Sequence, residues 1–496
     1  VRFPTVSDTV QSEDRLVRVS QLRHAGSTRF WILAAFITLT LLIGGGSRPD
    51  IQSLIVLRPV AVLLCGYALL SLNRDHLRGF GILFGLTAAI FLSVAVQLIP
   101  LPPSIWMRLP GRDLIADIDR VAALGAVWRP ITLHPVGTWN ALFSMFVPIG
   151  VLLLAVQITR EERFRLLYLF CALGLASGLL GLIQISGPIG GPLYLYTHTN
   201  DSSAVGLFAN RNHAAVFLAC LFPMLAVLAS AGITRGDELR RRSWAAIAIG
   251  FFLVPLILVT GSRAGLLIGL AGLVSVPFLY RAPIASPRSS RRWLVFLLGG
   301  IALVGLVLLF VAFSRGEATT RLLESSSEEA RFQFWGPILD LAWRYFPVGT
   351  GAGSFVEIFQ IHEPYEMLRV NYLNHAHNDW LELLLTGGLP ALALMIIAIA
   401  GLLLRSLRVW TSGDGGSRDI AIARMASVIL LMLGIASIGD YPARTPSIMC
   451  LVMLAAGWLS GRGEVARRGS RIADLHYPKQ LEELLRTALD YHNFVL

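Results

Sequence analysis

Charged side chains are scarce in this chain of 496 residues. Asp, Glu, Lys and Arg together make up 15% of the sequence, whereas hydrophobic residues make up 55% and the mean hydropathy is +0.65. A soluble domain of this size needs a more polar surface, so the composition excludes an ordinary globular enzyme and indicates a membrane protein. Cysteine is rare as well, and its four positions all fall within apolar runs. We interpret these cysteines as small core residues, not as a disulfide framework or a metal site.

The formal net charge of +11 is the one feature that suggests a nucleic-acid partner. The basic residues, however, are spread through short segments between apolar runs and do not gather in one patch. Orientation of a membrane protein explains such a distribution better than nucleic-acid binding does. We therefore expect the lipid bilayer, and no nucleic acid, as a partner.

Apolar runs of about 20 residues, the length that crosses a bilayer, recur along the chain. We count twelve of them, beginning near Trp31, Leu54, Phe80, Ala141, Leu166, His213, Trp244, Ala264, Trp293, Trp380, Ile420 and Ser447. No repeat or soluble domain interrupts this pattern. The sequence therefore predicts an all-α polytopic membrane protein with about 12 transmembrane helices.

The distribution of arginine predicts the orientation. Residues 1–30 hold five arginines, and no small-residue cleavage site follows the first apolar run, so we expect a retained anchor with a cytoplasmic amino end. With that start, 27 of the 42 Lys and Arg residues fall on the cytoplasmic side. The predicted organisation is a cytoplasmic segment 1–30, a transmembrane domain 31–461 and a basic cytoplasmic tail 462–496. That tail either forms an amphipathic helix, since leucines recur at helical spacing after residue 480, or is a poorly ordered end.

The same orientation places two long loops, 100–140 and 314–378, on the outer face, with the second directly before the tenth span. Polar motifs gather on this face. Gly261-Ser262-Arg263-Ala264-Gly265 holds an arginine in a tight turn, where it either anchors at the interface or binds a phosphate or carboxylate. An aromatic segment from Arg331 to Trp335 leads to Gly349, Gly351 and Gly353, which we interpret as a plain turn in preference to an anion-binding nest.

Histidines mark the third and fourth motifs. His375 and His377 lie just before the tenth span, followed by Asn378 and Asp379. A neutral imidazole can accept a proton from an attacking hydroxyl, and the neighbouring amide or carboxylate can orient it; a partial metal set or a helix cap are the alternatives. Before the sixth span stand Asn210, Arg211, Asn212 and His213, where Asn212 is also a candidate helix cap.

These motifs, taken in order and spacing, resemble the O-antigen ligase and polymerase family over roughly residues 128–400. The likeness includes Arg129-Pro-Ile-Thr-Leu-His-Pro135 in the first long loop. The family's His-Asn pattern continues with a glycine ten residues beyond the Asn, met here by Gly388, and then a Gly, Thr or Tyr where this chain has Ala391. That departure weakens an assignment to the ligases in particular, but leaves the family resemblance intact.

The resemblance implies an inner-membrane glycosyltransferase of the GT-C type, active on the outer (periplasmic) side in surface polysaccharide or lipopolysaccharide assembly. Its donor would be a glycan on undecaprenyl diphosphate and its acceptor a glycan or lipid hydroxyl. Such proteins are regarded as inverting and metal-independent, so we expect no metal or cofactor. Carried over by position, Arg263 and Arg331 would hold the diphosphate and His377 would activate the acceptor. Supporting roles would fall to His375, Asn378, Asp379, Asn210, Arg211 and Asn212.

Other readings of the chain remain open at this point. One is a relative that glycosylates protein, and the acceptor class is not fixed by the sequence. A metal-dependent relative would need acids on the outer face, and Asp117 with Asp119 offers such a pair, although an amphipathic loop helix explains it more simply. A transporter or flippase should show charges at mid-membrane depth or paired repeat halves. Here Arg58 and Arg424 are the only basic residues within the predicted spans.

Overall fold

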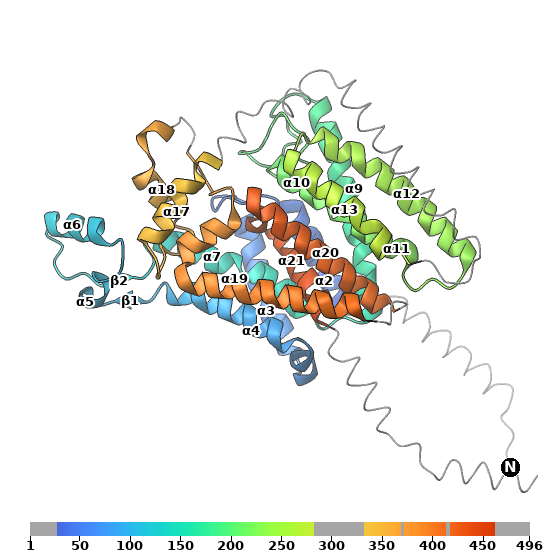
Figure 1. Cartoon of the computed structure of the whole chain (residues 1–496), viewed down its shortest axis with the longest axis horizontal. Coiled ribbons are helices and arrows are strands. Elements are labelled where there is room, and N and C mark those ends of the chain that lie inside the picture. The colour runs from blue at the N-terminus through green and yellow to red at the C-terminus, as the bar shows by residue number, and fades with distance from the viewer. Residues whose placement is uncertain (1–26, 282–331, 369–371, 413–416, 462–496) are drawn as a thin grey trace, which may run out of the picture.

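The computed structural model describes residues 27–281, 332–368, 372–412 and 417–461 (Figure 1). The predicted span near Trp293, the predicted phosphate ligand Arg331 and the predicted tail helix lie outside these residues. Nearly all regular structure in the described part is helical, with one two-stranded antiparallel sheet. This confirms an all-α membrane architecture.

The elements follow one another in chain order. The first half comprises α2 (Thr28–Ile43), α3 (Leu54–Leu70), α4 (Arg74–Val96), β1 (Pro100–Leu101), α5 (Pro103–Trp106), α6 (Asp113–Val121), β2 (Arg129–Pro130), α7 (Pro135–Ser144), α8 (Phe146–Ala155) and α9 (Arg160–Ser186). The second half comprises α10 (Arg211–Ala219), α11 (Leu221–Ser230), α12 (Gly236–Val259), α13 (Arg263–Leu279), α17 (Trp335–Arg344), α18 (Phe355–His362), η2 (Tyr365–Met367), α19 (Asp379–Thr411), α20 (Arg418–Gly439), η3 (Pro442–Arg444) and α21 (Pro446–Ser460).

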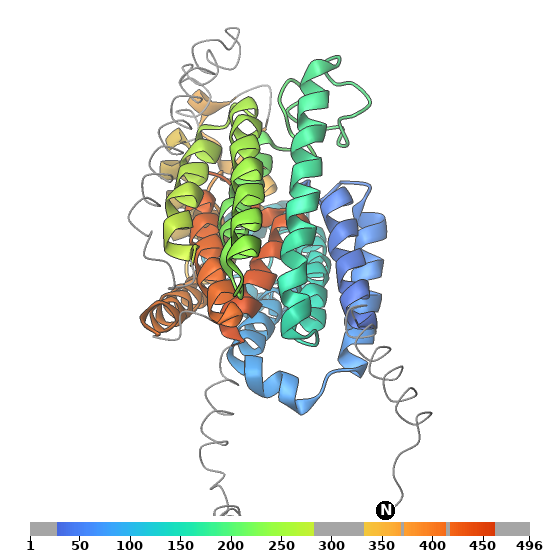
Figure 2. The same cartoon turned by 90° about the vertical axis from the view of Figure 1, so that its right-hand side faces the viewer.

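Seven helical segments in the described residues are long and apolar enough to cross a membrane. Four further apolar helices, α2, α3, α13 and α21, are shorter. These eleven match the predicted runs other than the one near Trp293. In Figure 2 the helices drawn in green to yellow-green, α9 to α13, run roughly side by side, as expected of helices that cross a bilayer together.

Several helices begin one to two turns before the apolar run that predicted them. The run near Leu166, for example, belongs to a helix that begins at Arg160. Thr159 caps this helix by accepting a hydrogen bond from the Glu162 N–H, and Glu162 bonds back to the Thr159 N–H. Such a capping box lets a helix extend into a charged segment, so hydropathy alone sets the boundary too late.

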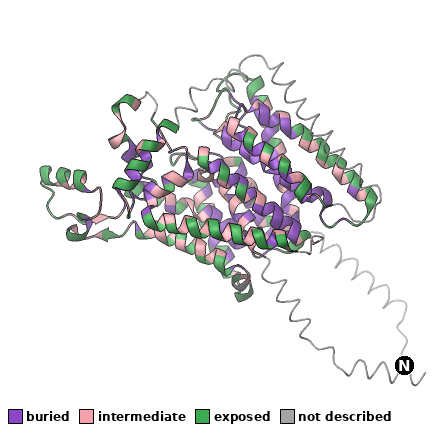
Figure 3. Cartoon of the chain, in the orientation of Figure 1, coloured by how far each residue is buried: buried purple, intermediate pink, exposed green. Residues whose placement is uncertain are grey.

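The centre of the bundle is the continuous segment formed by α10 and α11. Its apolar window is entirely buried (Figure 3), and the two helices pack against α9, α12, α13 and α20. A helix that is apolar all round belongs in the middle of a bundle, because no face of it needs to meet lipid or water. The start of α10, with its Asn-Arg-Asn-His motif, is thereby held at the centre of one end of the molecule.

The described parts of the two long loops lie at that end of the bundle, with α5 and α6 projecting away from it (Figure 1). A second apolar cluster joins α17 and α18 to the start of α19, with Phe355, Phe359 and Leu385 in its interior. Arg112, which is fully buried, donates to the carbonyl oxygens of Ile131 (2.8 Å) and Gly349 (3.0 Å) and so ties the first loop to the second. Because burial costs a charged group hydration, it lowers the pKa of Arg112 to about 10.

Candidate functional site

Five chain segments meet at one end of the bundle. They are the beginnings of α10, α13 and α19, the end of α20, and η3. Each segment brings polar side chains to a place where the helices on either side are apolar. Buried polar groups are costly unless they are paired, so the partners of each group indicate what the cluster holds in place.

The segment before α19 is folded tightly back over the first turn of that helix. Asn378 caps the helix by accepting a hydrogen bond from the Leu381 N–H (3.1 Å). His377 adopts a left-handed backbone conformation (φ 49°), which is uncommon for a residue other than glycine. The Ala376 N–H donates to the side chain of Glu382 at 3.0 Å. These contacts fix both histidines against the helix start instead of leaving them on a loose loop.

His377 is paired with an acidic residue from a distant segment. Its Nδ1 lies 3.3 Å from Oδ1 of Asp440, the residue that follows α20. Asp440 also accepts hydrogen bonds from Nδ2 of Asn212 (2.6 Å) and from the Tyr441 N–H (3.0 Å). The carboxylate therefore joins α10, α19 and α20, and it orients the His377 ring through one nitrogen.

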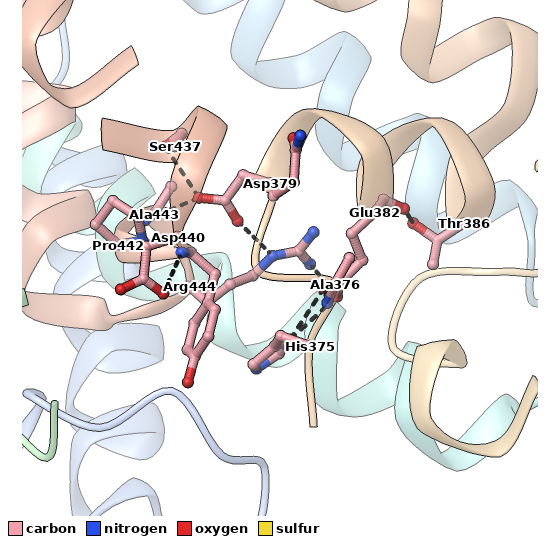
Figure 4. Close-up of polar contacts among 12 residues, drawn as sticks. His375, Ala376, Asp379, Glu382, Thr386, Ser437, Asp440, Pro442, Ala443 and Arg444 are labelled. Atoms are coloured by element: carbon pink, nitrogen blue, oxygen red, sulfur yellow. Dashed lines mark hydrogen bonds and ion pairs between the residues drawn. The ribbon is translucent and has the colours of Figure 1, made fainter. Parts of the chain in front are cut away.

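His375 belongs to a second network (Figure 4). Its Nδ1 lies 3.1 Å from Oε1 of Glu382, and Glu382 is in turn 3.4 Å from Nη1 of Arg444. Nε of Arg444 donates to Asp379 at 2.9 Å, and Asp379 also accepts from Ser437 (3.0 Å) and the Ala443 N–H (3.2 Å). Burial opposes the charge on Arg444, but the carboxylates of Glu382 and Asp379 outweigh it and raise the pKa of this guanidinium above its usual value. Arg444 thus stays charged and locks η3 to the first turn of α19.

Three imidazole rings surround the side chain of Tyr441. The ring centroids of His213, His375 and His377 lie 5.0, 4.5 and 4.8 Å from that of Tyr441. His213 comes from the fourth predicted motif and the other two from the third. The structure therefore unites two motifs that are more than 160 residues apart in the sequence.

The turn that carries Arg263 lies beside α10. Ser262 caps α13 by accepting from the Gly265 N–H (2.9 Å), and Arg263 is the first residue of that helix. A Cβ atom placed on Gly261 would lie 3.6 Å from Nη1 of Arg211, so the guanidinium of Arg211 borders this turn. Gly265 allows α13 to lie this close to α10, because a Cβ atom on residue 265 would lie only 2.2 Å from Cβ of Ala215.

The structure also decides the roles of the other predicted cap and of the glycine turn. Asn210, not Asn212, caps α10, accepting from the Asn212 N–H (2.8 Å), so the predicted capping role of Asn212 is wrong and its side chain instead holds Asp440. In the glycine turn, the Gly349 and Gly351 N–H groups donate to the carbonyls of Tyr345 and Thr386, both at 2.8 Å. This agrees with the plain turn that we preferred over an anion-binding nest.

The acidic pair of the first loop does not converge on a common point. Asp117 pairs with Arg120 at 2.8 Å, and Asp119 pairs with Arg129. Within the residues that the structure describes, no group of three or more His, Cys, Asp or Glu side chains is placed to hold a metal ion. The two aspartates thus each serve an arginine of their own loop.

Sequence reasoning missed Glu382, Asp440, Tyr441 and Arg444. A signal for them existed, since Asp440, Tyr441 and Arg444 stand between two apolar runs at a predicted outer junction, and Glu382 is an acid inside an apolar run. The residues of that junction form no familiar motif, so the sequence alone does not mark them as a site. His377 and Asp440 are 63 residues apart and Asp379 and Arg444 are 65 apart, so the packing of the helices is needed to reveal these pairs.

Part of the chain matches a known protein family. Residues 245–396 match the family described as O-Antigen ligase, a stretch that includes the Arg263 turn and both histidines before α19. This part of the chain is similar to the O-antigen ligase family. The match supports a ligase- or polymerase-like role in surface polysaccharide assembly.

The chain also shares a short segment with unrelated enzymes. It is 94% identical over 33 residues to an adenylosuccinate synthetase of Stenotrophomonas maltophilia (strain R551-3), and 91% identical over 33 residues to one of Xanthomonas campestris pv. campestris (strain B100). Each match covers 7% of this chain and 8% of the synthetase. A segment of this length carries neither the fold nor the activity of the synthetase.

Proposed function

We propose that this protein transfers a glycan from undecaprenyl diphosphate to an acceptor hydroxyl. The reaction would take place where α10, α13 and α19 begin, on the outer side of the inner membrane. The observation that carries the proposal is the meeting of the Arg211 and Arg263 turns with the His377–Asp440 pair at one end of the bundle. Guanidinium groups suit a diphosphate, and a carboxylate-oriented imidazole suits proton abstraction.

Arg211 and Arg263 would hold the diphosphate leaving group. Negative charge grows on the leaving oxygen as the glycosidic bond to phosphate breaks, and fixed guanidinium donors in a poorly hydrated site stabilise that charge. Arg211, which we expected only to support the site, takes a primary role here because its guanidinium borders the Gly261 turn. Arg331 stays a predicted ligand from the family pattern.

His377 would act as the general base. A carboxylate at Nδ1 favours the tautomer that carries its proton there, which makes Nε2 the basic nitrogen. The proton of the acceptor hydroxyl would pass to this nitrogen while the acceptor oxygen bonds to the anomeric carbon. The bond from that carbon to the diphosphate oxygen breaks, and the oxygen keeps the electron pair. A single displacement of this kind inverts the anomeric centre.

The mechanism requires no metal, because the two guanidinium groups supply the positive charge that a divalent ion would otherwise bring. The remaining residues position the His377–Asp440 pair. Asp379, Glu382 and Arg444 hold His375 and the first turn of α19, and Asn378 caps that helix. Asn210 and Asn212 serve α10 and Asp440 in the same way. The donor's polyprenyl chain would lie against the apolar helices, which explains catalysis at a membrane face.

The direct test is transfer by purified protein. Undecaprenyl-diphosphate glycan would be incubated with lipid A core, with a growing glycan and with a protein acceptor, each with and without EDTA. We expect sugar on the lipid or glycan acceptor, undiminished by EDTA. Loss of transfer on chelation with rescue by Mg²⁺ or Mn²⁺ would contradict metal independence, and sugar on the protein alone would favour a protein-glycosylating relative.

A further inference from the structure

Two arginines lie inside apolar helices of the bundle, Arg58 in α3 and Arg424 in α20. A charged side chain within a membrane span is costly, so each of these arginines needs a partner that offsets its desolvation. Arg424 has charge-compensating partners within the protein, whereas Arg58 meets only neutral groups among the described residues.

Arg424 closes the end of a neighbouring helix. Its Nε donates to the carbonyl of Val409, and its Nη2 donates to that of Ser412, both at 3.1 Å. The last carbonyls of a helix lack partners within the helix and carry partial negative charge. Arg424 is therefore matched by the end of α19, where its charge is also favourable.

Arg58 meets only neutral groups. Its Nη1 donates to Oδ1 of Asn140 at 2.9 Å and its Nη2 donates to Oγ of Ser144 at 3.0 Å. Its Nε is buried and has no hydrogen-bond partner among the residues that the structure describes. In the described ranges, no carboxylate forms an ion pair with Arg58, so its positive charge has no counter-charge from the protein there.

The seam between α3 and α7 that holds Arg58 borders the lipid-facing surface. Ile55, one turn before Arg58 on α3, is 76% exposed, and Trp139, beside Asn140 on α7, is 49% exposed. Phe143 stacks on Trp139 with a centroid distance of 5.8 Å and continues the exposed apolar strip along α7. Arg58 lies four residues into α3, about 6 Å along the helix axis from its first residue, a depth that a lipid headgroup can reach.

We propose that Arg58, Asn140 and Ser144 form a binding site for the headgroup phosphate of an anionic glycerophospholipid, whose acyl chains lie along Trp139 and Phe143. A guanidinium suits a phosphate because its planar fork can donate two hydrogen bonds to the phosphate oxygens. The phosphate supplies the missing counter-charge, and the neutral amide and hydroxyl hold the guanidinium in place for it. The occupant is a bulk lipid because the seam opens onto exposed apolar side chains, whereas the proposed donor site is built on α10, α13, α19 and α20.

Lipid retention on intact protein tests the site. Delipidated wild type, Arg58→Gln and Arg74→Gln would be incubated with phosphatidylglycerol or with phosphatidylcholine of the same acyl chains, and bound lipid counted by native mass spectrometry. Arg74 is an exposed first residue of α4, so its variant matches the charge loss outside the seam. We expect Arg58→Gln to lose about fivefold in bound phosphatidylglycerol, and Arg74→Gln to behave as wild type.

Three results would overturn the proposal. They are unchanged retention in Arg58→Gln, an equal loss in Arg74→Gln, and preferential displacement of phosphatidylglycerol by undecaprenyl phosphate. Should Arg58→Gln fail to insert, the wild type decides, because equal retention of phosphatidylglycerol and phosphatidylcholine contradicts an anion site. Arg58→Lys, which keeps the charge but loses the planar fork, should retain an intermediate amount of phosphatidylglycerol.

Discussion

Nδ1 of His377 lies 3.3 Å from Oδ1 of Asp440, although the two residues are 63 positions apart. The carboxylate is buried, with 3% of its side chain exposed, and it is further held by Asn212. A carboxylate fixed in this manner determines which way the imidazole ring faces and which of its nitrogens carries the proton. Asp440 is therefore a positioning residue for the proposed base.

Asp440→Asn tests that role while keeping the side chain's size. We expect transfer to fall by about 10²-fold or more, within the range of general-base catalysis, with donor binding retained. The imidazolium form of His377 would lose its partner charge, so the acidic limb of the pH–rate profile should move to lower pH. A purely structural role for Asp440 would reduce folded protein without moving that limb.

Arg211 and Arg263 should each require their guanidinium shape. Lysine keeps the charge but cannot make two parallel hydrogen bonds to a phosphate, so Arg211→Lys and Arg263→Lys should both lose transfer and weaken donor binding. Arg120→Lys in the exposed helix α6 is the matched control and should be neutral. Full transfer by Arg263→Ala would remove that residue from the mechanism.

Arg444 should matter for stability more than an exposed arginine does. Its loss would leave Asp379 and Glu382, which are 5% and 2% exposed, without their cation. We expect Arg444→Gln to lower the free energy of unfolding by roughly 3–5 kcal/mol, measured by denaturation in detergent. Arg48→Gln breaks a pair whose Asp50 is 57% exposed, and should cost about 1 kcal/mol or less. Equal costs for the two would contradict a buried network.

The predicted orientation can be checked with single cysteines, because the chain's own four cysteines are buried. Tyr365→Cys and Val121→Cys place thiols at positions that are 84% and 88% exposed in the two long loops. A membrane-impermeant maleimide should label both in right-side-out vesicles and should spare Thr234→Cys, exposed after α11 at the opposite end. The reverse pattern would place the site on the cytoplasmic side.

Hydropathy predicts the bundle well, since a bilayer demands long apolar helices whatever their packing. Hydropathy places the helix start too far along the chain where capping residues such as Thr159 extend a helix into a charged segment. The motif residues Arg211, Arg263 and His377 stand out in the sequence because polar groups at the ends of apolar runs need a reason. The sequence pattern does not show that these residues lie in one cluster.

Packing between helices brings these residues into one cluster. Asp440 meets His377 because α20 lies against α19, and Arg211 borders the Gly261 turn because Gly265 and Ala215 let α13 approach α10. Glu382 illustrates the same limit, since an acid in an apolar run is counted as part of a span. Its role is visible only in the structure, where its carboxylate contacts both Arg444 and His375.

The central claim is that His377 removes the acceptor proton during glycan transfer. Wild type, His377→Ala and His375→Ala would be compared for transfer from undecaprenyl-diphosphate glycan and, separately, for donor binding. We expect His377→Ala to lose about 10²–10⁴-fold in transfer rate while it binds the donor normally, with a smaller loss for His375→Ala. Near-normal transfer by correctly inserted His377→Ala, or donor binding lost in step with turnover, would contradict it.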